Sequence, residues 1–456
     1  MTLSCFKAYD VRGKLGRDLD ANVLRAIGQG LVAARGARSV VVGRDVRASS
    51  ERLAAALIDG LTSAGADVRD IGLCGTEEVY FATDHYGADA GLCVTASHNP
   101  IDYNGVKLVG AGARPLSPAD LDAVREAAEA ALAGFAPSPA PGDVTPADPR
   151  DAYVERVVSF VEPGALGPLK VLVNAGNGAA GPTFDRIAAA LAKAGARVEW
   201  VRLHHAPDPS FPNGIPNPLL PENQPVTGDA VVAQGCDLGL AWDGDFDRCF
   251  FFDHEGRFVP GEYVVALLAG AFLARAPGAT IVHEPRVEWA TRAAIAAAGG
   301  RAVRARSGHA FMKAAMRDAD AVYGGEMSAH HYFRRFMSCD SGMIPALLVL
   351  AHLSATGRGL ADLVGEMRAA FPSSGEINFR VADAEAAIAR VEARFGAEAC
   401  ARDDLDGMSL EFADWRLNLR RSNTEPLLRL NVETRGDAGL LAARVAELTA
   451  LIEGME

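Results

Sequence analysis

The chain carries the stretch SVVVGRD at residues 39–45, in which a run of β-branched residues ends in a polar turn. A segment rich in alanine and leucine follows, then Ala64, Gly65 and Ala66, and then a second apolar run near residues 68–71. The β-branched run favours a strand, and a glycine just past a helix commonly takes a positive φ. The stretch therefore predicts a strand–helix–strand unit with parallel strands.

The same order recurs twice further along the chain. KVLVN at residues 170–174 leads through a glycine-rich segment to a helix, and a strand is expected at 198–201. TIVH at residues 280–283 leads to a helix that ends near 298–300, and a strand is expected at 302–303. Three repeats predict an α/β fold of three related domains in tandem, with mixed, mostly parallel sheets and right-handed crossovers.

Breaks in composition predict the domain boundaries. Residues 136–149 are rich in proline and cannot hold a regular helix or strand, so they are interpreted as a linker. Further breaks are expected near 253–256 and 371–375. The predicted domains are residues 1–146, 147–252, 253–371 and 372–456.

The last predicted domain has a different pattern. Strand-like runs at 377–381, 415–420 and 427–432 alternate with helical segments. This pattern predicts a small antiparallel α+β domain.

Composition excludes several classes of partner. A net charge of −13 argues against binding to nucleic acid. The seven cysteines include no C-x-x-C pair, and residues 1–14 lack the apolar core of a secretory signal, so a reducing cytoplasm is expected. The apolar stretch 263–274 is too short to span a membrane and is interpreted as a buried helix, so no membrane association is expected.

A serine follows the strand-like run at residues 91–94, in the segment TASHNP at 95–100. The hydroxyl of Ser97 lies among small and polar residues and could act as a nucleophile or carry a phosphoryl group. A helix N-cap or a simple turn pair is the alternative.

Three carboxylates alternate in DGDFDR at residues 243–248. They would repel one another unless a cation lay between them, and oxygen ligands suit Mg²⁺. A calcium EF-hand would need glycine where Arg248 stands and glutamate where His254 stands. A phosphatase loop of the D-x-D-x-T type would need threonine in place of Asp247, and a solvated acidic turn stays open as the plain alternative.

Two more polar loops follow. GGEMSAH at residues 324–330 offers the carboxylate of Glu326 and the hydroxyl of Ser328 to sugar hydroxyls, although Ser328 could equally cap a helix. RRSNTEP at residues 420–426 combines guanidinium, hydroxyl and amide groups that suit a phosphate, with a plain β-turn as the alternative.

The motifs TASHNP, DGDFDR, GEMSAH and RRSNT, in this order, resemble the four active-site loops of the α-D-phosphohexomutase superfamily. The resemblance implies three related α/β domains and a fourth domain of TATA-binding-protein-like topology around a central cleft. GEMSAH is similar to the phosphomannomutase and phosphomannomutase/phosphoglucomutase branch of bacteria, which feeds GDP-mannose synthesis.

The resemblance implies reversible conversion of mannose 6-phosphate to mannose 1-phosphate through a phosphoserine enzyme. Mg²⁺ would be the cofactor, and hexose 1,6-bisphosphate the intermediate and activator. The enzyme would act on a hexose phosphate as a monomer or homodimer. A phosphoglucomutase or dual-specificity mutase is the alternative, and a Mg²⁺-dependent sugar phosphatase or a non-catalytic sugar-phosphate binder is a more distant one.

The resemblance also assigns roles to individual residues. Ser97 would carry the phosphoryl group. The metal ligands would be Ser97, once phosphorylated, with Asp243, Asp245 and Asp247. Further catalytic candidates are Arg12, His98, Lys107, Arg248, His309 and His330. Substrate would be bound by Tyr9, Arg286, Glu326, Ser328, Arg420, Ser422, Asn423 and Thr424. Some relatives have a lysine in the loop that here carries Arg286, so its phosphate contact is a departure from the pattern.

Overall fold

The computed structural model describes residues 2–421 and 427–454. The chain forms two compact units, one made of residues 1–258 and 335–357 and the other of residues 259–334 and 358–456. The chain therefore passes from one unit to the other three times, and the first unit is built from two separate segments.

The first sheet of the first unit has the strand order β1-β5-β4-β2-β3-β7, with β6 beside β5. Its strands are β1 (Val11–Lys14), β2 (Ser39–Arg44), β3 (Asp67–Leu73), β4 (Ala90–Val94), β5 (Tyr103–Gly110), β6 (Arg114–Pro115) and β7 (Val144–Pro146). Strands β4, β2, β3 and β7 pair in parallel, whereas β1, β5 and β4 pair antiparallel. The predicted mixed sheet is confirmed.

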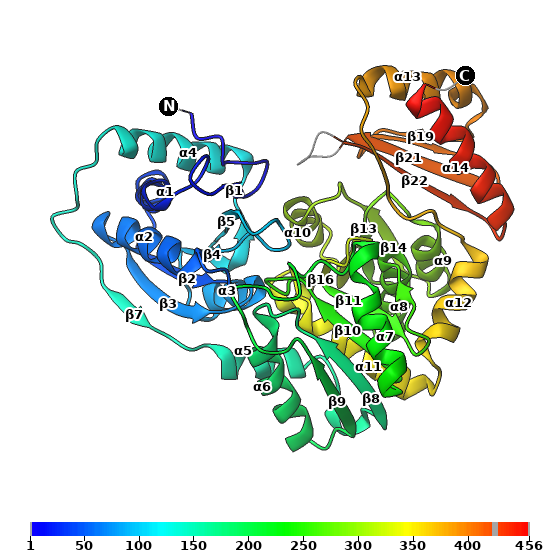
Figure 1. Ribbon diagram of the computed structural model, residues 1–456, viewed down its shortest axis with the longest axis horizontal. Coiled ribbons are helices and arrows are strands. Elements are labelled where there is room, and N and C mark those ends of the chain that lie inside the picture. The colour runs from blue at the N-terminus through cyan, green and yellow to red at the C-terminus, as the bar shows by residue number, and fades with distance from the viewer. Residues whose placement is uncertain (1, 422–426, 455–456) are drawn as a thin grey trace. The chain divides into compact units, whose positions relative to one another are not determined.

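Helices cover both faces of this sheet (Figure 1). They are α1 (Ala21–Arg35), α2 (Ser50–Ser63), α3 (Thr76–His85) and α4 (Pro118–Ala133), and a 3-10 turn η1 (Ala111–Ala113) follows β5. Helices α1, α2 and α4 share one apolar core with Val40 and Val42. Helix α3 packs in a separate core with Val41. Because side chains alternate along a strand, Val41 faces the opposite side from its neighbours.

One expectation about the linker is wrong. Residues 136–149 do hold a short strand, β7, whose Val144 pairs with Val68 of β3. Strand β7 lies at the edge of the sheet, where Pro146 can end a strand because an edge residue needs no second hydrogen-bonding partner. Proline therefore limited this strand to three residues but did not prevent it.

The second sheet has the order β12-β11-β10-β8-β9, with the short strand β12 (Phe258–Val259) at one edge. Its strands are β8 (Leu169–Asn174), β9 (Val198–Leu203), β10 (Leu238–Trp242) and β11 (Cys249–Asp253). The other elements of this part are α5 (Arg150–Val158), η2 (Pro163–Ala165), α6 (Ala180–Lys193), η3 (Pro221–Asn223), α7 (Pro225–Gln234), η4 (Arg334–Phe336), β17 (Cys339–Asp340) and α11 (Met343–Thr356). Strands β10, β8 and β9 pair in parallel and β11 runs antiparallel to β10, so this sheet also repeats the predicted pattern.

The second unit begins with another α/β sheet, in the order β14-β13-β15-β16. Its strands are β13 (Thr280–His283), β14 (Arg301–Arg304), β15 (Tyr323–Gly325) and β16 (His331–Phe333). The helices are α8 (Gly261–Arg275), α9 (Trp289–Ala297), α10 (His309–Asp318) and α12 (Leu360–Ala370), and β12 (Phe258–Val259) lies where the units change. The apolar stretch 263–274 forms α8, which is largely buried as predicted.

The last part of the second unit is an antiparallel sheet with two helices (Figure 1). The strand order is β18-β22-β21-β20-β19. The elements are β18 (Ile377–Phe379), α13 (Ala384–Phe395), η5 (Gly396–Glu398), β19 (Ala401–Asp403), β20 (Met408–Glu411), β21 (Trp415–Arg421), β22 (Leu428–Thr434) and α14 (Ala438–Glu453). The predicted α+β domain is confirmed, although β19 and β20 were not predicted from the sequence.

The glycine that follows the helix in each repeat has the expected backbone. Gly65, Gly195 and Gly299 have φ of 99°, 91° and 67°. An L-residue with a side chain rarely adopts these angles, so glycine allows the chain to turn from helix to strand. The three repeats therefore share a glycine of positive φ after the helix as well as the same sequence pattern.

Among the residues that the structure describes, no single helix is long and apolar enough to cross a membrane. Helices α11 and α12 reach the required length and apolar composition only when they are counted together, and the chain bends by 96° between them.

Candidate active site

Ser97 lies in the turn between β4 and β5 and is 3% exposed. Its φ of 49° places a non-glycine residue in the left-handed region, which costs free energy and is common at functional sites. The backbone N–H of Ser97 donates to the hydroxyl of Thr95 at 2.8 Å. The turn is thus held in a strained form that aims the Ser97 side chain.

Three polar groups surround the Ser97 hydroxyl. The hydroxyl donates to the carboxylate of Asp243 at 2.6 Å and accepts from the guanidinium of Arg248 at 3.3 Å. The Nδ1 atom of His98 lies 3.0 Å from the same oxygen, and Arg248 also hydrogen-bonds that nitrogen. Residues far apart in the sequence therefore converge on one oxygen atom.

His98 is held in its neutral form. Burial lowers its pKa well below the usual range, and the positive charge of Arg248 lowers it further. A neutral imidazole can accept a hydrogen bond at Nδ1, which is the atom that lies next to Arg248 and the Ser97 hydroxyl.

The aspartates of DGDFDR lie in the loop between β10 and β11 and are all buried. Carboxylate oxygens of Asp243, Asp245 and Asp247 lie within 4.8 Å of one another. One buried oxygen each of Asp243 and Asp245 has no hydrogen-bond partner among the described residues. Buried oxygens that lack a donor are costly unless a cation binds them, so this set fits a divalent metal ion.

Lys107 on β5 compensates part of this negative charge. Its ammonium lies 2.8 Å from Asp245 and also pairs with Asp247. Burial raises the pKa of Asp247 well above its usual value, and the charge of Asp245 raises it further. Burial would also raise the pKa of Asp245, but the adjacent Lys107 holds it below the usual range. Asp245 is therefore the most firmly ionised of the three carboxylates.

The DGDFDR loop at residues 243–248, here called the metal loop, approaches the turn at residues 95–100 that carries Ser97, here called the serine turn. A Cβ atom on Gly244 would lie 2.8 Å from the carbonyl oxygen of Ser97. The ring of buried Phe246 packs against Gly75. A Cβ atom on Gly75 would lie only 2.3 Å from ring atoms of Phe246. Glycine at these two positions lets the loops meet, and Phe246 anchors the metal loop against the start of α3.

Tyr9 and Arg12, near the N-terminus, were also predicted to contribute. Arg12 on β1 hydrogen-bonds the side chain of Asn99 and pairs with Asp10 at 2.9 Å. Its contact with Asn99 brings it to the serine turn. Tyr9 is half-buried in the bend before β1. Its contact with substrate stays a prediction.

The predicted sugar loop is the hairpin turn between β15 and β16. No helix follows Ser328 within the described residues of this hairpin, so the N-cap alternative is wrong. Glu326 accepts from the hydroxyl of Tyr332 at 2.5 Å and from the backbone of Gly308 at 2.7 Å. The Nδ1 atom of His330 lies 3.1 Å from the hydroxyl of Ser328.

Glu326 sits in an environment that favours its protonated form. Burial raises its pKa to about 7, and the negative charge of Glu284 contributes to the same shift. His309, the first residue of α10, follows Gly308 directly in the chain. The hairpin and the start of α10 thus gather Glu326, Ser328, His309 and His330, all predicted from sequence.

An arginine cluster forms in the second unit around one carboxylate. Glu376 accepts from Arg286 at 3.1 Å and from Arg420 at 3.2 Å, and pairs with Arg429 at 3.2 Å. Arg286 also pairs with Glu284. Guanidinium groups concentrated in this way suit a phosphate. The predicted phosphate ligands Ser422, Asn423 and Thr424 lie outside the described residues.

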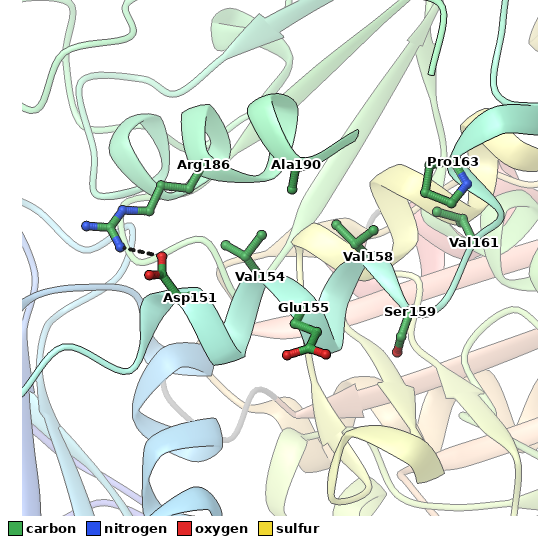
Figure 2. A pocket seen from close by; sticks show the side chains of 9 residues that line it. All are labelled: Asp151, Val154, Glu155, Val158, Ser159, Val161, Pro163, Arg186 and Ala190. Carbon is green, nitrogen blue, oxygen red and sulfur yellow. Dashed lines mark hydrogen bonds and ion pairs between the residues drawn. The ribbon is translucent and has the colours of Figure 1, made fainter. Parts of the chain in front are cut away.

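A surface hollow of about 520 Å³ lies between α5 and α6. Figure 2 shows that Val154 and Val158 of α5 line it, with Arg186 of α6 bonded to Asp151 at its edge. None of the residues that line it belongs to the four loops. The loops, rather than the hollow, carry the candidate chemistry.

Four family models match the chain in order. They are described as phosphoglucomutase/phosphomannomutase alpha/beta/alpha domain I at residues 4–133, domain II at 151–256, domain III at 260–371, and the C-terminal domain at 376–451. The chain belongs to the phosphoglucomutase/phosphomannomutase family.

Individual relatives agree with this assignment. The phosphomannomutase of Salmonella montevideo is 54% identical over 451 residues, which cover 99% of each chain. A protein of Xanthomonas campestris pv. campestris, strain ATCC 33913, described as phosphohexose mutases, is 54% identical and covers 100% of both chains. The crystal structure of a family member from Burkholderia thailandensis has a TM-score of 0.87 at 32% identity, covering 100% of this chain and 98% of the other.

Family membership gives the site its chemical class. This is an enzyme of the isomerase type that moves a phosphoryl group, and the family implies a metal ion, for which the acidic cluster of the first unit is present. The predicted α/β fold and the superfamily resemblance are confirmed by the same matches.

Several residues of the site were missed. Thr76 and Thr95 both donate to Asp245, at 2.7 Å and 3.2 Å. Glu376 accepts hydrogen bonds from Arg286 and Arg420. Tyr332 donates to Glu326. Arg47 donates to backbone carbonyl groups of the turn that carries Ser97, and the sequence around residue 47 gives no sign of this partner.

Proposed function

We propose that the protein is a phosphomannomutase, which interconverts mannose 6-phosphate and mannose 1-phosphate for GDP-mannose synthesis. The observation that carries this proposal is the convergence of Asp243, Arg248 and His98 on the hydroxyl of Ser97. The Salmonella relative named phosphomannomutase, 54% identical over nearly the whole chain, supports the choice of substrate.

Ser97 carries the phosphoryl group in the resting enzyme and passes it to a hydroxyl of the sugar phosphate. The bond from phosphorus to Ser97 Oγ breaks as the bond to the sugar oxygen forms, which gives hexose 1,6-bisphosphate. The second phosphoryl group then returns to Ser97. The bisphosphate is thus the intermediate, and free bisphosphate activates the enzyme by phosphorylating Ser97.

The cations near Ser97 balance the charge of this transfer. Arg248 and Arg12 stabilise the negative charge on the transferring group. Lys107 keeps the carboxylate of Asp245 ionised and holds Asp247 in place by an ion pair. A Mg²⁺ ion held by Asp243, Asp245, Asp247 and an oxygen of phosphorylated Ser97 would neutralise charge on the phosphoryl group.

The sugar hydroxyl must lose a proton when it attacks. Histidine is the side chain whose unperturbed pKa lies closest to neutral pH, which suits this transfer, and His309 and His330 are the candidates. We assign the proton transfer to these two residues rather than to His98, because burial and Arg248 keep the pKa of His98 well below neutrality.

Substrate is bound by the groups of the second unit together with Tyr9. Glu326 and Ser328 hydrogen-bond sugar hydroxyls. Arg286, Arg420, Ser422, Asn423 and Thr424 bind the phosphate that does not react. The same groups accept the sugar in both orientations, so one set of ligands serves both half-reactions.

A coupled assay of mannose 1-phosphate against glucose 1-phosphate tests this proposal. We expect a higher kcat/KM for mannose phosphates and detectable turnover of glucose phosphates, because one hydroxyl contact discriminates by only about 10- to 200-fold. The Xanthomonas relative described as phosphohexose mutases favours dual specificity as the second candidate. Better turnover of glucose 1-phosphate would select a phosphoglucomutase, and release of inorganic phosphate from mannose 6-phosphate would indicate a phosphatase.

A further inference from the structure

A buried arginine lies beside the serine turn. Arg47 is in the loop between β2 and α2, and 1% of its side chain is exposed. Asp45 holds it from behind, since one carboxylate oxygen accepts from the backbone N–H of Arg47 at 3.0 Å and the other lies 3.5 Å from its Nε. The hydroxyl of Ser50, at the start of α2, donates to the same carboxylate at 2.5 Å. Arg47 is therefore fixed to the end of strand β2.

The guanidinium of Arg47 donates hydrogen bonds to four backbone carbonyl groups in and directly after the serine turn. Its Nη2 donates to the carbonyl oxygen of Ser97 at 2.9 Å and to that of Asn99 at 2.5 Å. Its Nη1 donates to the carbonyl oxygens of Pro100 at 2.8 Å and Tyr103 at 3.2 Å. A single planar cation thus holds the peptide groups of Ser97, Asn99 and Pro100 in the turn, and that of Tyr103 at the start of β5.

The turn needs such an outside partner. Ser97 has the unfavourable φ of 49°, which persists only where the surroundings hold it. The carbonyl oxygen of Ser97 that Arg47 binds is the same atom that Gly244 of the metal loop approaches. The peptide group of Ser97 is therefore clamped between Arg47 on one side and the metal loop on the other.

We propose that Arg47 is a positioning residue that fixes the direction of the Ser97 hydroxyl for phosphoryl transfer. The proposal rests on the proposed function of Ser97. Arg47 does not touch the hydroxyl oxygen and acts through the backbone of the turn. Its planar fork is essential, because a lysine ammonium offers three donors in a different geometry and cannot bind four carbonyl groups.

The test compares Arg47→Ala and Arg47→Lys with wild type in the mutase assay. Arg44→Ala is the matched control, because Arg44 ends the same strand, is 24% exposed and pairs only at 3.6 Å and 3.9 Å. We expect kcat to fall by about 100-fold for Arg47→Ala, the effect of a small misplacement of a reacting group. The KM for mannose phosphates should stay unchanged, and the control should match wild type.

Two readouts separate positioning from a loss of folding. Phosphorylation of Ser97 by hexose 1,6-bisphosphate, followed by intact mass, should slow in parallel with kcat. Added guanidinium ion should restore part of the kcat of Arg47→Ala, because it refills the space that the deleted fork occupied. If Arg47→Ala does not fold, Arg47→Lys decides the question, since it keeps a cation opposite Asp45.

A kcat of wild-type size in a folded Arg47→Ala or Arg47→Lys variant would overturn the proposal. A rise in KM at unchanged kcat would also overturn it. Failure of the proposed function looks different, because wild type itself would then carry no phosphate on Ser97 and show no mutase activity.

Discussion

The hydroxyl of Ser97 donates to a carboxylate oxygen of Asp243 across a distance of 2.6 Å, although the two residues are 146 positions apart in the chain. This bond joins the proposed nucleophile directly to the loop that carries the acidic cluster. Both residues are buried, so water does not compete for the contact. Changes at either residue should therefore affect chemistry more than folding.

Ser97→Ala should abolish phosphoryl exchange and leave the fold intact. The residue has no substitute nucleophile, and loss of a nucleophile costs on the order of 10⁴ to 10⁶ in rate. Intact-mass spectrometry should find one phosphate, about 80 Da, on wild type and none on the variant. A phosphate that persists on the variant would place the nucleophile elsewhere.

Asp245→Asn should cripple turnover and weaken the binding of Mg²⁺. Asp245 is the carboxylate whose pKa Lys107 holds below the usual range, so its charge contributes to the site at every working pH. Asp229→Asn on the exposed face of α7 is the control. Activity should be measured against Mg²⁺ concentration, and full activity of wild type in excess EDTA would contradict the assignment.

Lys107→Met should destabilise the protein strongly when no divalent cation is present. The change leaves two buried carboxylates without their cation, and breaking a buried pair in this way costs about 3–5 kcal/mol. Mg²⁺ would then replace part of the lost charge. Thermal melting with and without Mg²⁺ should show a larger increase in Tm for the variant than for wild type, and equal increases would refute this reading.

Glu326 should make stability fall as the pH rises. Its pKa is raised from 4.5 to about 7 by burial, so between these values the unfolded chain loses a proton that the folded chain keeps. The unfolded state then binds fewer protons, and the free energy of unfolding decreases from about pH 4.5 to 7. Buried Glu262 behaves in the same way, with a pKa raised by burial to about 7.

The measurement for this prediction is Tm against pH. Glu326→Gln should reduce the slope between pH 5 and 7 without removing it, because Glu262 still contributes. A variant with the slope of wild type would show that Glu326 ionises normally in the folded protein.

Glu376→Gln should weaken substrate binding. The carboxylate holds Arg286, Arg420 and Arg429 together, and a neutral amide would let these cations repel one another. We expect KM for hexose phosphates to rise about tenfold, or about 1.4 kcal/mol, at nearly constant kcat. Glu366→Gln on exposed α12 is the control. A lower KM would mean that Glu376 competes with the substrate phosphate instead.

The sequence predicted those parts of the fold that depend on local patterns. Strand β13 and the glycines after the helices follow from β-branched runs and from the need for a positive φ. Strand β7 was missed because its pairing with β3 is a tertiary effect that composition alone does not reveal. Strands β19 and β20 are short and carry no clear alternation.

The residues of the candidate site also fall into two groups, those that a local sequence pattern predicted and those that it did not. Ser97 and the aspartates of DGDFDR were predicted because their chemistry lies within a few consecutive residues. Arg47 and Glu376 act on groups far away in the sequence, and a lone buried charge gives no local signal of its partner. Their roles became visible only through contacts in three dimensions.

The return of residues 335–357 to the first unit affects how the protein is made. Helix α11 supplies buried contacts there, for example the backbone N–H of Met343, which donates to Glu77 at 3.2 Å. A ribosome must therefore release residues well past 258 before the first unit has all its parts, although domains generally fold as they emerge. A fragment cut after Phe258 would lack α11, so cloning the halves as separate pieces would divide one folding unit.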